Sequence, residues 1–282
     1  FKPARQASTH HVVRSENLIR ANSLSSMVWG SMSIIGASLG GILSAAIGYQ
    51  MAFVLNSLSF LVSAYYISQI KIEIPTIATP VRNIWRDIVE GYHFMLRTPM
   101  VYSMIFMGMA WGFVGGAYMV LLPIYGAGVY HQGDFGIGIL YAVQGAGVLI
   151  GGLLVGKLAQ GKIQRMKTIY GWSYLFQGLF FVIFALTDTL VVGSIVLLLM
   201  RITGGLIIPL DSTLLQHYTP KAMQGRVFSL QMAIFSVVLQ SSMLTIGVLL
   251  KYFSPQTLGV SFGLVCIVIS VPWLIAFYTK RI

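Results

Sequence analysis

Charged residues are scarce in this chain of 282 residues: they make up 9% of the total, and the mean hydropathy is +0.81. Soluble globular domains carry about 25% charged residues, so this composition excludes that class. The single cysteine, Cys266, lies inside an apolar run and cannot form an internal disulfide. No cleavable signal peptide precedes the first apolar run. These absences indicate an integral membrane protein.

Catalytic and metal-binding patterns are also lacking. The five histidines fall outside the apolar runs, where none faces a carboxylate, and no serine has a plausible base nearby. No two potential metal ligands share the spacing of a metal site. We therefore expect neither an enzyme nor a bound cofactor.

Long apolar runs dominate the chain. A hydrocarbon core about 30 Å thick requires about 20 apolar residues in a helix, and helices satisfy their own backbone groups in lipid. Eight such runs are present, which predicts an all-α polytopic membrane protein. The expected helices are roughly 24–47, 51–70, 100–124, 137–158, 168–186, 190–215, 227–250 and 258–278.

Positive charge alternates along the chain. Sixteen of the 18 lysines and arginines precede the first run, follow every second run or close the chain, whereas the turns between them hold only Lys251. Cationic loops resist translocation, so the basic loops are expected in the cytoplasm, and two basic ends require an even number of crossings. The net charge of +11 then reflects topology and attraction to anionic lipid head groups. No aromatic-interleaved basic stripe suggests nucleic acid.

Segment 71–99 differs from the apolar runs. Pro75 and Pro80 break regular structure, and residues 81–97 then alternate apolar and charged positions at helical spacing. This pattern predicts an amphipathic helix on the cytoplasmic surface or under the bundle. We therefore expect three parts: the remainder of an N-terminal half (1–70), a cytoplasmic linker (71–99) and a C-terminal six-helix half (100–282).

Apart from Lys157 at the very end of the span 137–158, two charged residues lie on the expected spans. Arg201 falls near the middle of its span, where a charge costs about 2.5–3.5 kcal/mol. It is expected to face a cavity and bind substrate, or else to make a structural salt link or bond carbonyls at a break around Gly204-Gly205. Asp211 lies about 15 Å further along a straight helix, too far to pair with Arg201. We expect it to pair with Arg226 or a neighbouring base, although it is also the one proton-carrier candidate on a span.

Aromatic, methionine and amide side chains recur at helical spacing on three spans, in the stripes Met104, Met107, Trp111 and Tyr118, then Tyr141, Gln144 and Val148, and then Gln231, Phe235, Val238, Ser242 and Thr245. Such surfaces suit bulky, partly apolar ligands, although ordinary helix packing explains the same pattern. The residues expected to bind substrate are Trp111, Tyr118, Tyr141, Gln144, Arg201, Gln231 and Phe235.

Glycines cluster on the spans 24–47 and 137–158 with small-xxx-small spacing, which lets helix backbones approach closely. The pattern reflects either simple tight packing or a seam across which two halves slide. The expected seam residues are Gly36, Gly40, Gly41, Gly147 and Gly151.

Several segments carry a family resemblance: 20–24 (RANSL), 90–94 (EGYHF), and 213–216 (TLLQ) followed by Thr219-Pro220 and 225–229 (GRVFS). They resemble the bacterial efflux branch of the major facilitator superfamily, which contains macrolide exporters and the enterobactin exporter. The similar positions are the start of the fifth helix, the helix before the seventh, and the link between the tenth and eleventh. The resemblance implies a major-facilitator-type helical bundle in which eight transmembrane helices, the fifth to the twelfth, are present and four N-terminal ones are missing, as in a fragment.

Two further motifs depart from the family pattern. Residues 36–41 resemble the antiporter motif, with Ala37 where proline is usual, and residues 156–162 resemble the cytoplasmic loop motif, with Gln160 where aspartate is typical. The second departure puts a charge-based gate in doubt. The expected gating residues are Gly156, Lys157, Asp211, Gly225 and Arg226.

The resemblance implies a secondary active efflux transporter in the bacterial inner membrane, exporting a drug-like or siderophore-like small molecule by alternating access and proton antiport. Such a protein confers multidrug or macrolide resistance. Its expected partners are substrate, protons and membrane lipid, and it is expected to be a monomer. The coupling acid is expected upstream of Phe1. Two alternatives stay open: an importer or facilitator of a nutrient with the same fold, and a non-transporting membrane scaffold or sensor.

Overall fold

The computed structural model describes residues 13, 17–69 and 84–279, with the backbone alone described for Ile84 and for part of the first long helix. Over these ranges the chain is helical, as expected. The elements are α2 (Leu18–Ser68), α3 (Ile84–Arg97), α4 (Pro99–Ile124), the π-helical turn η2 (Tyr125–Val129), α5 (Gly133–Ala159), α6 (Ile163–Ala185), α7 (Leu190–Tyr218), α8 (Lys221–Leu249) and α9 (Pro255–Tyr278).

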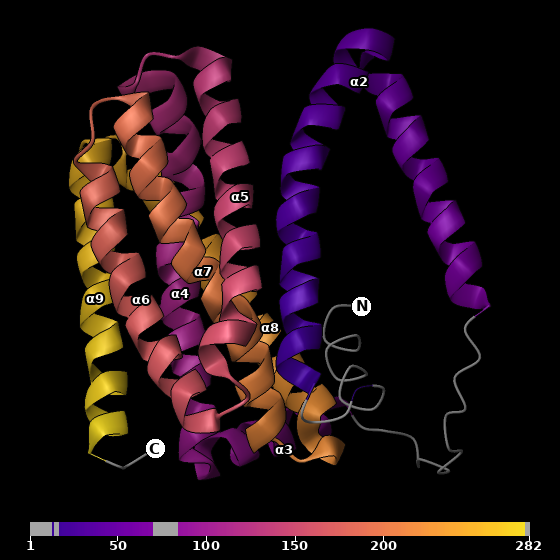
Figure 1. The fold of residues 1–282 in the computed structure, drawn as a ribbon, viewed down its shortest axis with the longest axis vertical. Helices are drawn as coiled ribbons and strands as arrows, with labels where there is room; N and C mark the ends of the chain where they lie inside the picture. The colour runs from indigo at the N-terminus through magenta and orange to yellow at the C-terminus, as the bar shows by residue number, and fades with distance from the viewer. Residues whose placement is uncertain (1–12, 14–16, 70–83, 280–282) are drawn as a thin grey trace.

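Seven helical segments of the described chain are long and apolar enough to cross a membrane, one fewer than the expected eight. They are residues 50–68 of α2, α4 together with η2, and α5 to α9. The first part of α2, residues 18–47, is not among them, although it runs beside α5 along the bundle (Figure 1). The chain is therefore a multi-pass membrane protein.

A sharp bend divides α2 into two arms. Gly48 has φ 78° and ψ 155°, a conformation that a side chain disfavours, so a glycine can reverse the helix here within one residue. The first arm (18–47) packs against α5 and α7, and the second arm (50–68) stands apart from the other helices (Figure 1). The apolar side chains of the second arm are exposed, among them Phe53 and Phe60. In a membrane this arm therefore meets lipid or other helices.

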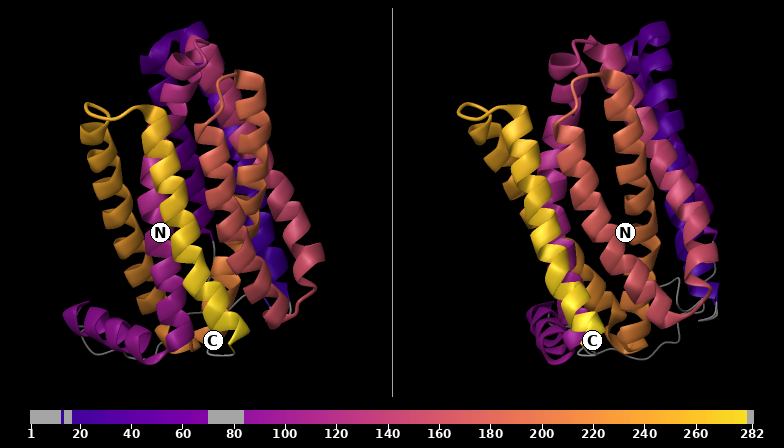
Figure 2. Two further views of the ribbon diagram at one scale, coloured as in Figure 1. Left: turned by 90° about the vertical axis from the view of Figure 1, so that its left-hand side faces the viewer. Right: turned by 60° about the vertical axis from the view of Figure 1, so that its left-hand side comes forward.

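Helices α4 to α9 form one group (Figure 2). Within it α5 packs against α7, α6 packs against both α7 and α9, and α4 packs against α8 and α9. Large side chains fill the core, including the fully buried Tyr125, Phe181, Phe184 and Phe228. The tight contact of α5, α6 and α7 is what places the side chains of the candidate site.

The two ends of the bundle differ in charge. The α5–α6 and α7–α8 turns lie at the same end as α3, and these turns and the helix ends beside them carry Lys157, Lys162, Arg165 and Lys221. We call this the basic end. At the opposite end, the described turns contain Lys251 as their one lysine or arginine. The alternation of charge along the sequence thus becomes a difference between the two ends of the fold.

Helix α3 lies across the basic end (Figure 2). Its Gly91 packs against Arg226 of α8, and the Arg226 guanidinium forms ion pairs with Asp87 at 2.8 Å and Glu90 at 2.6 Å. Met95 is buried, whereas Trp85 is 76% exposed. The amphipathic helix therefore packs on the bundle through one side, while other apolar side chains, among them Ile88 and Val89, are exposed.

Candidate functional site

Arg201 occupies a buried position near the middle of α7. It is 5% exposed, and its Nε is buried with no hydrogen-bond partner. The guanidinium carbon lies 5.3 Å from the ring centre of Tyr118 and 5.9 Å from that of Trp111, both on α4. Aromatic faces attract cations, so these rings partly offset the loss of water. No acidic side chain of the described residues forms an ion pair with Arg201, and α7 continues through Gly204 and Gly205 without the expected break.

Glycines give the Arg201 side chain its space. A Cβ added at Gly147 of α5 would lie 2.5 Å from the Arg201 Cβ, so any larger residue there would push against the base of the side chain. A Cβ added at Gly204 would lie 3.5 Å from the guanidinium carbon. The two glycines therefore let α5 approach Arg201 and let the guanidinium lie back against α7.

Two glutamines complete this polar cluster. The Tyr118 hydroxyl donates a hydrogen bond of 2.5 Å to Gln144 Oε1 on α5. Gln177 on α6 is 1% exposed, and neither its amide oxygen nor its amide nitrogen has a hydrogen-bond partner. The position of a Gly204 Cβ would be 3.5 Å from Arg201 Nη1 and 3.7 Å from Gln177 Oε1, so both groups border the same small space. Gln177 was missed by sequence reasoning. We refer to Trp111, Tyr118, Gln144, Gln177 and Arg201 as the Arg201 cluster.

A second polar cluster surrounds Asp211, closer to the basic end. The Tyr170 hydroxyl donates to Asp211 Oδ1 at 2.7 Å, and Gln231 Nε2 donates to Asp211 Oδ2 at 2.8 Å. The carboxylate thus joins α7 to α6 and α8 through neutral donors. Lys167 of α6 places its Nζ 5.0 Å from the Tyr218 ring centre.

The expected pairing of Asp211 with Arg226 is wrong. Arg226 pairs with Asp87 and Glu90 of α3, because the amphipathic helix brings two carboxylates to the start of α8. Gln231, which was expected to line the substrate cavity, instead donates a hydrogen bond from its amide to Asp211. Phe235, one turn further along α8, packs against Gly112 of α4.

Most of the remaining stripe residues are packed side chains, although Thr245 is exposed. Tyr141 is half-buried against the core, and the Ser242 hydroxyl donates to the backbone oxygen of Phe113. Met104 and Met107 are buried. The Arg201 cluster thus unites Trp111, Tyr118, Gln144 and Arg201, while Gln231 and Phe235 line the α4–α8 contact.

The glycine seam is only partly where it was expected. Gly30 of α2 approaches the backbone of Gly145 and Leu149, and Gly152 approaches Met27. These contacts form the α2–α5 interface. Gly147 and Gly151, assigned to this seam, instead face α7. Gly36 has no neighbour within 4 Å of an added Cβ, and Gly40 and Gly41 lie outside the described side-chain positions.

Gly151 provides a direct test of the α5–α7 contact. Its added Cβ would collide with the Ile202 carbonyl oxygen and lie 2.7 Å from Gly205 Cα. We expect Gly151→Ala to destabilise the fold by about 1–3 kcal/mol, measured as thermal unfolding of the purified protein in detergent. The control is Gly156→Ala on the same helix, where nothing lies within 4 Å, and where alanine is expected to stabilise the helix by up to about 1 kcal/mol. Equal effects of the two substitutions would contradict this packing.

Residues expected in gating lie at the basic end. Lys157 is exposed, and an added Cβ at Gly156 or Gly225 would meet no neighbour within 4 Å. A hydrogen-bonded link holds this end instead: Asn22 Nδ2 of α2 donates to Thr213 Oγ1 and Gln216 Oε1 of α7, each at 2.9 Å. Two sequence segments that carried the family resemblance therefore meet in space.

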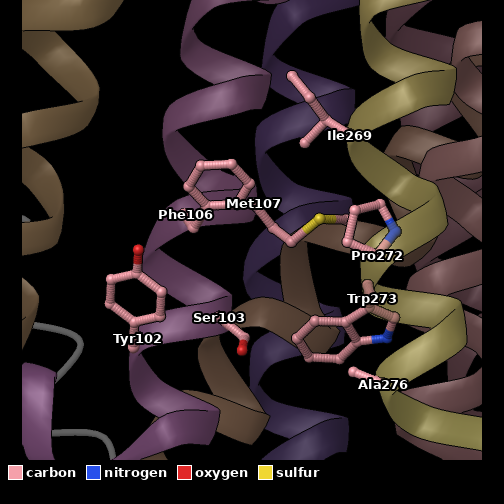
Figure 3. A pocket seen from close by; sticks show the side chains of 8 residues that line it. All are labelled: Tyr102, Ser103, Phe106, Met107, Ile269, Pro272, Trp273 and Ala276. Atoms are coloured by element: carbon pink, nitrogen blue, oxygen red, sulfur yellow. The ribbon is translucent and has the colours of Figure 1, made fainter.

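An apolar cavity of about 250 Å³ lies between α4 and α9, lined by eight side chains that include Met107 and Trp273 (Figure 3). None of the Arg201 cluster lines it. Across the described residues, no group of three or more histidine, cysteine or acidic side chains is placed to hold a metal ion. Within the described residues, the candidate site therefore consists of the two polar clusters.

The family model of the Major Facilitator Superfamily matches residues 1–240. The enterobactin exporter EntS of Shigella flexneri is 28% identical over 225 residues, covering 78% of this chain and 51% of the exporter. EntS of Salmonella typhimurium strain LT2 is 29% identical over 227 residues, covering 78% and 52%. The chain thus spans about half the length of these relatives. Because the family match extends over most of the sequence and the fold is a bundle of membrane-spanning helices, the chain belongs to the Major Facilitator Superfamily, whose members are transporters and not enzymes.

Proposed function

We propose that this chain forms the C-terminal six-helix half, and part of the N-terminal half, of a bacterial inner-membrane exporter. The exporter moves a drug-like or siderophore-like small molecule outwards by alternating access, in exchange for protons. The division at 71–99 and the cytoplasmic location of the basic end belong to this proposal. The similarity to exporters named for enterobactin supports the direction of transport.

The observation that carries the proposal is the Arg201 cluster. A buried arginine in a membrane-spanning helix is expensive, and such residues normally mark substrate or ion pathways. Here the guanidinium lies over two aromatic rings of α4, one of which bonds Gln144 of α5, and it borders the same small space as the Gln177 amide of α6. Substrate sites of such transporters lie near the middle of the membrane, where two halves meet and rock about the ligand.

Although the coupling acid was expected upstream of Phe1, the structure makes Asp211 our candidate for the proton-exchanging group. Among the acidic residues of the described membrane spans, Asp211 is the one that lies away from the helix ends. The two groups that donate hydrogen bonds to it are neutral. The carboxylate can therefore change charge without breaking an ion pair. The bond to Gln231 also ties it to α8, whose Phe235 contacts α4 close to Trp111. Protonation of Asp211 would alter these contacts, and so would connect the proton to the substrate site.

The function is tested in cells that carry the complete gene, with erythromycin and fluorescein as cationic and anionic probes. We expect accumulation of at least one probe to fall on expression, and an uncoupler to restore it. Faster uncoupler-sensitive uptake on expression would instead identify an importer. Binding of a probe without any flux would favour a scaffold or sensor.

A further inference from the structure

We infer that the Arg201 cluster binds a planar, singly charged anionic group of the transported molecule, such as a carboxylate or phenolate. This inference names the substrate class and rests on the proposed export function. Its starting point is a charge without a counter-charge: Arg201 is 5% exposed and forms no ion pair with any described acidic residue. A buried arginine normally pairs with an opposite charge, so the site is electrostatically prepared for an anion.

Gln177 provides a second, independent observation. It is almost completely buried, and its amide lacks a hydrogen-bond partner at both ends. Buried amides are normally bonded, so an unpartnered amide in a functional site points to a missing ligand. Both Gln177 Oε1 and Arg201 Nη1 lie within 4 Å of one point beside Gly204. A ligand group here meets the guanidinium and, after rotation of the Gln177 amide, its NH₂ donors as well.

The shape of the cluster selects a planar group. A guanidinium presents parallel N–H donors that match the two oxygens of a carboxylate. The rings of Trp111 and Tyr118 face the same guanidinium, and Trp111, which is only partly buried, offers a surface on which an aromatic ring bearing the anion would pack. A single arginine suits one negative charge better than the two of a phosphate monoester. The ligand is therefore expected to be an aryl or similarly flat acid.

The test compares two ligands that differ in charge. Protein expressed from the complete gene is purified and dialysed to equilibrium against 2-naphthoate or the uncharged 2-naphthamide at neutral pH. We expect naphthoate to bind at least about tenfold more tightly, as charge-assisted hydrogen bonds require. Gln177→Leu should weaken naphthoate binding about three- to tenfold, whereas Gln164→Leu, an exposed position on the same helix, should not.

Two isosteric or conservative variants guard against misfolding. Gln177→Glu places a carboxylate beside Arg201 and should abolish the preference for naphthoate, while Arg201→Lys should keep part of it. Equal binding of the two ligands by the unmodified protein would overturn the inference, and would be the outcome if an acid elsewhere in the complete protein already pairs with Arg201. If cells export the probes with no preference for the anionic one, this inference is wrong but the proposed export function still stands. Naphthoate binding without export of any probe would instead remove the export function.

Discussion

Asp211→Asn is expected to abolish proton-driven accumulation while leaving exchange of substrate across the membrane intact. Asparagine is uncharged, like a protonated aspartate, and its oxygen still accepts a hydrogen bond from Tyr170. Gln231 can turn its amide to accept from the new NH₂ group, so the contact between α7 and α8 is retained. What is lost is the ability to take up and release a proton. The transporter is then held in one protonation state and only equilibrates its substrate.

The measurement uses proteoliposomes containing the protein from its complete gene, with a pH difference imposed across the membrane. One proton exchanged per substrate supports about tenfold accumulation for each pH unit, because one unit corresponds to about 1.4 kcal/mol. The Asp211→Asn variant should show no accumulation but near-normal counterflow of labelled substrate. Asp188→Asn, at an exposed aspartate of the opposite end, is the matched control and should accumulate normally. Accumulation by Asp211→Asn would assign coupling to another group.

Arg201→Ala is expected to reduce export about 10- to 100-fold without destabilising the protein. The loss of export follows from the removed charge-assisted hydrogen bonds. Stability is expected to be retained because burying a guanidinium with an unbonded Nε costs free energy, and alanine carries no such cost. An inactive variant that melts at the same or a higher temperature would separate function from folding, since a merely structural arginine would lower the melting temperature when removed.

Export by Arg201→Ala is measured with the probe that the unmodified protein exports best. The matched control is Lys251→Ala, which removes one positive charge from an exposed turn of the opposite end and should leave export unchanged. Efflux by Arg201→Ala at the level of the unmodified protein would remove Arg201 from the mechanism.

Sequence patterns predicted the long helices well because lipid leaves few alternatives for twenty apolar residues. They also brought together Arg201, Trp111, Tyr118 and Gln144, since charge and large aromatic residues within apolar runs are conspicuous. Gln177 was missed because one amide in an apolar run carries no signal until its neighbours are known. Its importance depends on how α6 crosses α7, which periodicity does not determine.

The predictions that were wrong concern how a helix is rotated about its axis and which residues far apart in the sequence meet. Small-xxx-small spacing marks a close approach but not the partner, and Gly151 turned out to face α7 rather than α2. Arg226 pairs with Asp87 and Glu90 because α3 folds back under α8, a placement that the sequence between them does not reveal.

The uncompensated charge of Arg201 has a consequence for the energetics of the whole cycle. A carrier that releases an anion outside and admits a proton transfers two positive charges inward per turnover, so its cycle is electrogenic. Each elementary charge that crosses the membrane is worth about 2.3 kcal/mol per 100 mV. An interior-negative voltage is therefore expected to drive the proposed exchange even when the pH is equal on both sides, and setting that voltage with potassium and valinomycin should change the rate of exchange.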